Sequence, residues 1–234
     1  MLSPDTRLLS FDLWCTLIRS HPGFKARRNE RMRTLLCSML SPEAFDRLAR
    51  MQDQQADRIA EARGRDVLFA ERVTMVAQAA GCPSPDSETL ERLYAEQAAL
   101  LEIFPPCLID PDTPQHFAAL KERGYAIGLI SNTGCLHGDL MRRALAHLGI
   151  DVFFEYMVFS NEVGFAKPHP CIFQRMAELS RTAPAHITHI GDNLQADVLG
   201  AQKNGMRALH MQGEVTLRTI VLRGQGPSNG TASL

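Results

Sequence analysis

The chain of 234 residues lacks an excess of charge of either sign, a metal-binding cysteine pattern and a long hydrophobic run. Its formal net charge of -1 at pH 7 provides no field that would recruit nucleic acid or an anionic membrane. No apolar window approaches the roughly 20 residues that a transmembrane helix needs. The six cysteines form no CxxC pair and have no Cys/His ligand spacing. We therefore expect reduced thiols rather than a disulfide framework or a zinc site.

The N-terminus also lacks the basic stretch followed by an apolar stretch that marks a secretory signal. Together with the cysteine usage, this leads us to expect a cytoplasmic protein. The apolar fraction of 45% and the charged fraction of 22% are ordinary for a globular protein that buries an ample core. We expect a small molecule as the partner, with no nucleic acid and no membrane, and the apolar-rich helical region is compatible with a homodimer.

Short apolar runs alternate with helical patterns along much of the chain. Buried-strand patterns occur at 8–11, 125–131, 156–160, 186–192 and 206–211. Helical patterns occur at 113–124, 138–149, 171–181 and 195–205. Alternation of this kind is typical of α/β proteins with a parallel sheet. We predict an α/β fold with a doubly wound, parallel, five-stranded (Rossmann-like) core.

The region from about 24 to 102 has a different composition. Leu, Ala, Met, Arg, Glu and Gln dominate it, no strand-like alternation is present, and 45–62 has the clearest helical spacing. The prolines of GCPSPD divide it into at least two helical parts. We predict an all-helical cap domain inserted into the core after the first strand. The predicted units are the core at 1–19 and 104–223, the cap at 20–103, and a disordered Gly/Ser-rich tail at 224–234.

The only tryptophan lies two residues after an aspartate that ends the first predicted strand, in FDLWCTL (11–17). Desolvating a carboxylate is costly, so Asp12 at the end of an apolar strand requires a reason. In open α/β sheets, ligands bind beyond the carboxyl ends of the strands. Ser131 and Asp192 also follow predicted strands. We therefore expect these three side chains to converge on one crevice.

Four segments resemble, in order, the motifs of the haloacid dehalogenase (HAD) superfamily of hydrolases. FDLWCTL resembles the first motif, a strand followed by D-x-D-x-T, and LISNT (129–133) resembles the second, an apolar strand ending in Ser or Thr. GFAKPHPCIF (164–173) resembles the third, in which a lysine opens a helix. HIGDNLQADVLGAQKNGM (189–206) resembles the fourth, G-D-x-x-x-x-D. The resemblance covers essentially the whole chain, and the helical cap after the first motif indicates the subfamily that handles small soluble substrates.

The resemblance implies a role for each matching residue. Asp12 would be the nucleophile that forms an aspartyl intermediate, which water then cleaves. Ser131 and the amide of Asn132 would bind the oxygens of the transferred group. Lys167 would neutralise charge between the nucleophile and the phosphoryl group. Thr16 retains the turn-side hydroxyl of the first motif and is expected at the substrate.

The resemblance also implies a Mg²⁺ cofactor. In relatives that act on phosphate, the ion is held by the first aspartate, by the backbone carbonyl two residues later and by an aspartate of the fourth motif. Here these positions are Asp12, Trp14 through its carbonyl, and Asp192. Asp197 would support the site as a further ligand or from behind the ligands. Oxygen ligands suit this hard ion, so the metal site is expected to be complete.

Trp14 departs from the pattern of the family's phosphatases. They have an aspartate at this position, which protonates the leaving oxygen and later activates water, and tryptophan does neither. General acid–base help is worth about 10²–10⁴ in rate. The favoured interpretation is a Mg²⁺-dependent phosphatase or phosphotransfer enzyme for a small phosphorylated metabolite, slow or atypical because its acid–base group is missing.

Two alternatives stay open. One is a 2-haloacid dehalogenase-like hydrolase, because those relatives carry an aromatic residue where Trp14 stands and need no metal. Their fourth motif usually has Ser/Asn character, however, unlike GDNLQAD. The other is a catalytically degenerate HAD-fold binding protein in which the indole fills the pocket.

Several polar residues near the motifs are interpreted as structural. His186 and His189 alternate along a predicted strand, His169 stands at a helix start, and Asn193 is expected in a turn. The basic run KARRNERMR (25–33) could attract an anionic substrate from the cap, but a solvated helix face is the favoured interpretation.

Overall fold

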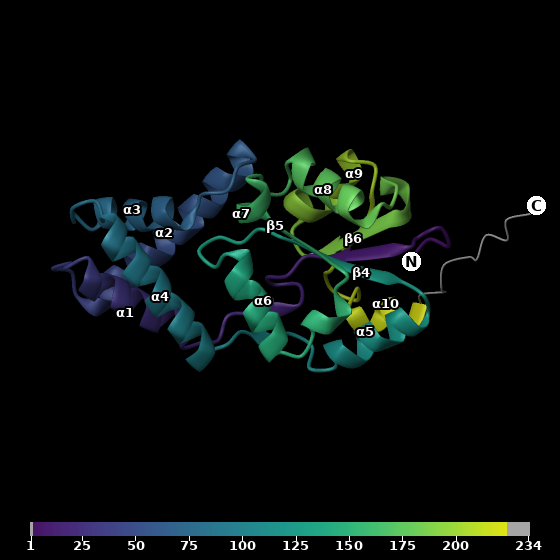
Figure 1. The fold of residues 1–234 in the computed structure, drawn as a ribbon, viewed down its shortest axis with the longest axis horizontal. Helices are drawn as coiled ribbons and strands as arrows, with labels where there is room; N and C mark the ends of the chain where they lie inside the picture. The colour runs from purple at the N-terminus through teal and green to yellow at the C-terminus, as the bar shows by residue number, and fades with distance from the viewer. Residues whose placement is uncertain (1, 224–234) are drawn as a thin grey trace, which may run out of the picture.

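A parallel sheet of five strands forms the centre of the computed structural model, which describes residues 2–223 (Figure 1). The strand order is β5–β4–β1–β6–β7, and all four pairings are parallel. The strands are β1 (Leu8–Phe11), β4 (Ala126–Ser131), β5 (Tyr156–Phe159), β6 (Ile187–Gly191) and β7 (Arg207–His210). All five predicted strands are confirmed, and the predicted tail at 224–234 lies outside the described residues.

Helices cover both faces of this sheet, as expected for a doubly wound fold (Figure 1). One face carries α5 (Thr113–Glu122), α6 (Gly138–His147) and α10 (Leu217–Arg223); the other carries α7 (Ser160–Val163), α8 (Pro170–Ser180) and α9 (Gly200–Lys203). Phe117 packs on Phe11 of the central strand in the first layer, with ring centroids 5.2 Å apart. Phe173 and Met176 pack on Leu8 and Ile130 in the second. The two apolar layers hold the sheet between them and so fix the positions of the carboxyl ends of its strands.

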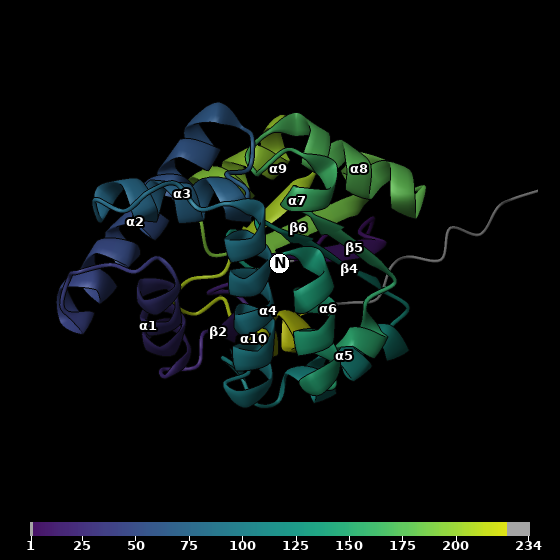
Figure 2. The same cartoon turned by 60° about the vertical axis from the view of Figure 1, so that its left-hand side comes forward.

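An all-helical cap is inserted between two short strands, β2 (Ile18–Arg19) and β3 (Cys107–Leu108), which pair antiparallel. The cap helices are α1 (Phe24–Leu35), α2 (Pro42–Arg63), α3 (Phe69–Ala79) and α4 (Ser87–Ile103). They form a separate apolar cluster around Phe45 and Val73. Figure 2 shows α4 running beside α6 of the core, where the Tyr94 hydroxyl donates to Asp139 at 2.8 Å. The inserted cap is confirmed, whereas the exact domain boundaries stay predictions.

Several elements differ from the prediction. The helix expected at 195–205 is divided into a π-helical segment, η3 (Leu194–Leu199), and the short α9. The cause is Asn193, whose side chain accepts from the amides of residues 195 and 196 while its carbonyl accepts from Asp197 N and Val198 N. Helix α10 and the pair β2–β3 were not predicted, because such short segments have too few residues to show a period.

Two 3₁₀ turns, η1 (Asp151–Phe153) and η2 (Pro184–His186), precede β5 and β6. Across residues 2–223, no helix combines the length and the apolar character that crossing a membrane requires.

Candidate functional site

The first motif forms a tight loop directly after β1. Asp12 N donates to the carbonyl of Ile190 in the neighbouring strand at 2.8 Å, which fixes Asp12 at the carboxyl end of the central strand. Leu17 N and Ile18 N both donate to the carbonyl of Leu13, at 2.9 and 3.0 Å, and close the loop. Trp14 lies within this loop, half-buried and packed against the main core cluster. The loop therefore presents residues 12 to 16 above the carboxyl end of the sheet.

Lys167 joins the motifs electrostatically. Its Nζ donates to Asp12 Oδ1 at 2.6 Å, to Asp197 Oδ1 at 2.6 Å and to the carbonyl of Ile130 at 2.9 Å. Burial alone would lower the pKa of Lys167, but the two carboxylates outweigh it and raise the pKa above its ordinary value. The lysine is therefore a fixed cation that is fully satisfied by three acceptors.

The pKa values of the acids around Lys167 are shifted in opposite directions. Burial raises the pKa of Asp12, and the neighbouring carboxylates add to this against the pull of Lys167. Burial and Asp197 likewise raise the pKa of Asp192. For Asp197, burial is outweighed by Lys167 and His189, which lower its pKa. Asp12 and Asp192 are thus the two carboxylates of this cluster whose pKa values lie above the ordinary value.

The carboxylates of Asp12, Asp192 and Asp197 have the chemistry of a cation site. Single oxygens of Asp12, Asp192 and Asp197 lie within 4.8 Å of one another. Thr16 Oγ1 bridges two of them, at 3.0 Å from Asp12 Oδ2 and 3.1 Å from Asp192 Oδ1. Both oxygens of Asp197 already accept hydrogen bonds, from Lys167, His189 and the amide of residue 193. Because one lysine faces three acids, the donor set fits a hard divalent ion.

The second motif occupies the neighbouring strand end. The Asn132 amide brackets Lys167: its Nδ2 donates to the Lys167 carbonyl at 3.1 Å, and its Oδ1 accepts from Lys167 N at 2.8 Å. Ser131 is fully buried, and its hydroxyl donates to the Asn132 carbonyl at 3.3 Å. Among the described residues, the cavity wall includes Asn132 and Thr133 but not Ser131. The structure therefore places Ser131 behind the cavity wall. It gathers five other predicted residues in the cluster around Lys167: Asp12, Thr16, Asn132, Asp192 and Asp197.

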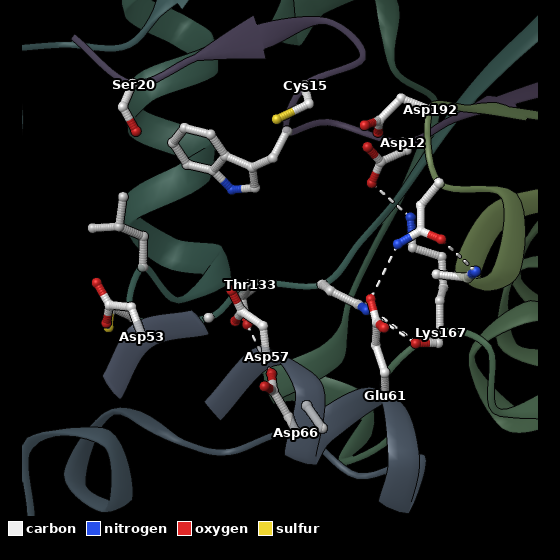
Figure 3. A pocket seen from close by; sticks show the side chains of 18 of the residues that line it. Asp12, Cys15, Ser20, Asp53, Asp57, Glu61, Asp66, Thr133, Lys167 and Asp192 are labelled. Atoms are coloured by element: carbon white, nitrogen blue, oxygen red, sulfur yellow. Dashed lines mark hydrogen bonds and ion pairs between the residues drawn. The ribbon is translucent and has the colours of Figure 1, made fainter. Parts of the chain in front are cut away.

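A cavity of about 510 Å³ lies between these strand ends and the cap (Figure 3). Its cap side contains two buried arginines and several acids. Arg28 pairs with Asp53 at 2.5 Å, and Arg72 pairs with Asp57 at 2.8 Å. Arg28 belongs to the basic run that was expected to be a solvated face. That expectation is wrong for Arg28, because Asp53 and Asn29 supply the acceptors that its buried guanidinium needs.

One corner of the cap contacts all the later motif loops; we call residues 61–66 the cap corner. Glu61 Oε1 accepts from Asn193 Nδ2 at 3.1 Å, beside the fourth motif. The Gly64 carbonyl accepts from Ala166 N at 3.3 Å, beside the third. Beside the second motif, Asp66 Oδ2 accepts from Thr133 Oγ1 at 3.0 Å and from Ser160 Oγ at 2.5 Å. The cap is thereby seated on the loops that form the site.

Sequence reasoning missed these cap residues and understated one histidine. His189 is fully buried, and its ring nitrogens lie 2.9 Å from Ser10 Oγ and 3.1 Å from Asp197 Oδ1. Burial lowers its pKa. A histidine in a buried strand directly before the fourth motif was a signal for such a support. The helix-start position of His169 is confirmed, since its Nδ1 accepts from Cys171 N.

A doubly wound core, a helical cap and a lysine-linked carboxylate cluster at the strand ends define a capped α/β protein with a polar site under its cap. The chain belongs to the haloacid dehalogenase-like hydrolase family, whose sequence pattern matches residues 6–205. The family resemblance of the four motifs is therefore confirmed.

Two curated relatives are phosphatases. The chain is 35% identical over 108 residues to the glyceraldehyde 3-phosphate phosphatase of Methanothermobacter thermautotrophicus, which covers 45% of this chain and 46% of that protein. It is 32% identical over 143 residues to the phosphoserine phosphatase of Thermus thermophilus, covering 60% and 53%. The chain thus spans about half the length of the curated relatives it matches.

Solved structures show the same fold. The HAD hydrolase YfnB of Bacillus subtilis, solved with magnesium bound, superposes with a TM-score of 0.68 at 21% identity, over 91% of each chain. The L-2-haloacid dehalogenase of Xanthobacter autotrophicus superposes with a TM-score of 0.59 at 18% identity, over 95% of this chain and 85% of that one. At these identities the likeness concerns the fold alone.

Proposed function

We propose that the chain is a Mg²⁺-dependent phosphatase or phosphotransfer enzyme that acts on a small phosphorylated metabolite through an aspartyl intermediate at Asp12. The observation that carries this proposal is the contact of Lys167 with Asp12 and Asp197, which leaves oxygens of Asp12 and Asp192 for a cation. The phosphatase names of the two curated relatives support it. A cytoplasmic location is part of the proposal, and its support is that all six cysteines are free.

The residues of the chain divide the chemistry among them. Asp12 attacks phosphorus with its carboxylate oxygen, the backbone amide of Asn132 binds an oxygen of the phosphoryl group, and Lys167 neutralises charge between the nucleophile and that group. Mg²⁺ would be held by Asp12, Asp192 and the Trp14 carbonyl, and when bound it supplies charge neutralisation at those oxygens. Asp197 holds Lys167 in place and supports the metal site from behind.

The position of Trp14 sets the expected rate. The indole N–H is too weak an acid to protonate the leaving oxygen, and the indole cannot take a proton from water. Leaving groups that depart without a proton should therefore react faster than poor ones, and the enzyme should be slower than relatives that retain the loop aspartate.

The test is hydrolysis of p-nitrophenyl phosphate with Mg²⁺ by the purified protein. Asp12→Asn should abolish turnover, because the amide is not a nucleophile. Asp151→Asn, the same change outside the cavity, is the matched control and should retain activity. Turnover that persists in Asp12→Asn would contradict the proposal.

Trp14 keeps one further function in view, because the chain shares its fold with an L-2-haloacid dehalogenase and carries an aromatic residue in the nucleophile loop. Halide release from 2-chloropropionate without added metal would identify that activity. Phosphatase turnover without halide release excludes it, and the loss of both activities indicates a binding protein.

A further inference from the structure

With Trp14 in place of an aspartate, the nucleophile loop has no general acid besides the nucleophile Asp12. The cap contains carboxyl groups that could replace it. In phosphoryl transfer the leaving oxygen lies roughly in line with and opposite to the attacking oxygen. With Asp12 at the strand ends, the leaving oxygen faces the cap. Four cap acids line that side of the cavity: Asp53, Asp57, Glu61 and Asp66 (Figure 3).

Three of these acids are close to a guanidinium. Asp53 lies 2.5 Å from Arg28, Asp57 lies 2.8 Å from Arg72, and Asp66 lies 4.0 Å from Arg72. These ion pairs hold the three carboxylates within the cap. Asp66 is also occupied by the hydroxyl groups of the core. These acids are therefore suited to structure rather than to proton transfer.

Glu61 has a different environment. Among the ion pairs formed by residues 2–223, none involves Glu61, and its Oε1 accepts from the neutral Asn193 Nδ2 at 3.1 Å. Asn193 Oδ1 accepts from the amides of Gln195 and Ala196, at 2.9 and 3.0 Å, so its Nδ2 is directed at Glu61. Because residue 193 follows Asp192, this contact fixes Glu61 next to the metal-binding loop.

The direction and exposure of Glu61 also fit proton transfer. Figure 3 shows Glu61 directed from its cap helix toward the part of the cavity that holds Lys167 and Asp12. The residue is exposed, so water has access to its carboxyl group. Its second oxygen is left for a substrate or a water molecule.

We propose that Glu61 performs the acid–base step that Trp14 cannot perform; the inference rests on the proposed phosphatase function. Asp12 Oδ bonds to phosphorus, the bond from phosphorus to the ester oxygen breaks, and that oxygen takes its electron pair and the Glu61 proton to leave as an alcohol. Glu61 then accepts a proton from water as the water oxygen bonds to phosphorus. The bond from phosphorus to Asp12 breaks, and its electron pair restores the carboxylate. Glu61 touches the reacting atoms only when the cap is seated.

Two substrates of similar shape test this assignment. Phenyl phosphate has a poor leaving group that needs a proton, whereas p-nitrophenyl phosphate has one that departs without it. Glu61→Gln should lower kcat/KM for phenyl phosphate about 10²-fold and leave kcat/KM for p-nitrophenyl phosphate within about threefold. It should also produce a burst of one p-nitrophenolate per Asp12, because water attack on the intermediate then becomes slow.

The controls separate proton transfer from folding. Glutamine retains the oxygen that accepts from Asn193, so the cap contact is preserved. Glu43→Gln makes the same change at an exposed position in the first turn of α2 and should behave as the unmodified protein. Asp57→Asn, one turn before Glu61, should produce no leaving-group-dependent loss.

Each outcome bears on a separate conclusion. Equal losses on both substrates, no loss in Glu61→Gln, or a selective loss in Asp57→Asn would overturn the role of Glu61 while the phosphatase function stands. If the unmodified protein hydrolyses neither substrate with Mg²⁺, the proposed function fails and this inference fails with it.

Discussion

Lys167 shows how a single side chain fixes the chemistry of this site. It is 2% exposed and contacts two carboxylates and a strand carbonyl. Removing one member of a buried ion pair leaves the other charge uncompensated, at a cost of about 3–5 kcal/mol. We therefore expect substitution of Lys167 to destabilise the strand ends.

Replacing Trp14 tests whether the missing acid limits turnover. In the Glu61→Gln background, Trp14→Asp places a carboxyl group in the nucleophile loop, and we expect turnover of phenyl phosphate to rise by at least about tenfold. The measurement is kcat with Mg²⁺ at saturating substrate.

Trp14→Ala is the control, because it removes the indole without adding an acid. If the two variants gain equally, the indole obstructs the cavity rather than replacing an acid. No gain from Trp14→Asp in that background would show that a carboxyl group at position 14 cannot replace Glu61.

The join between α2 and α3 shows how one turn seats the cap. Gly64 ends α2 in the left-handed region, with φ of 63°, and its carbonyl accepts from Ala166 N. A Cβ at this position would lie 2.7 Å from Cδ2 of His169. The imidazole is stacked on Phe165, with ring centroids 4.2 Å apart, and caps α8, so it has little freedom to move.

Two glycine substitutions separate this contact from backbone strain. Gly81→Ala meets nothing within 4 Å at φ of 70°, so it should cost only the roughly 1–2 kcal/mol of a left-handed alanine. Gly64→Ala should lower the free energy of unfolding further and also lower kcat, because it displaces the cap corner. Thermal unfolding and steady-state kinetics measure the two effects. Equal destabilisation by both variants, with kcat unchanged, would show that the cap corner tolerates the extra carbon.

The molecule as a whole is expected to respond to a divalent ion. A ligand that binds only the folded state stabilises it by about 2.7 kcal/mol at 100 times its Kd. Adding Mg²⁺ should raise the Tm by several degrees, and a chelator should reverse the change. Asp192→Asn should remove the response, because it deletes a proposed ligand. An undiminished response in this variant would place the ion elsewhere.

The sequence predicted the core more fully than it predicted the cavity. Asp12 and Asp192 were found because polar residues at the carboxyl ends of parallel strands share one edge of the sheet, whereas Asn132 and Lys167 were found through the resemblance of their motifs to the family. The strand order and the burial of Ser131 depend on packing that no local pattern records.

For a related reason, the cap side of the cavity could not be predicted from the sequence. Arg28 and Glu61 gain their roles from partners at positions 53 and 193, 25 and 132 residues away along the chain. In the sequence, both look like ordinary charges on an amphipathic helix.

The short ladder of β2 and β3 has a consequence for how such a protein can be rebuilt. Ile18 pairs with Leu108, and Arg19 pairs with Cys107. Paired strands lie about 4.8 Å apart, so the whole insertion leaves and re-enters the core at neighbouring points. A different insertion with closely spaced ends could be spliced onto these two strands without changing the register of the central sheet. The ladder thus lets the cap be replaced as one unit.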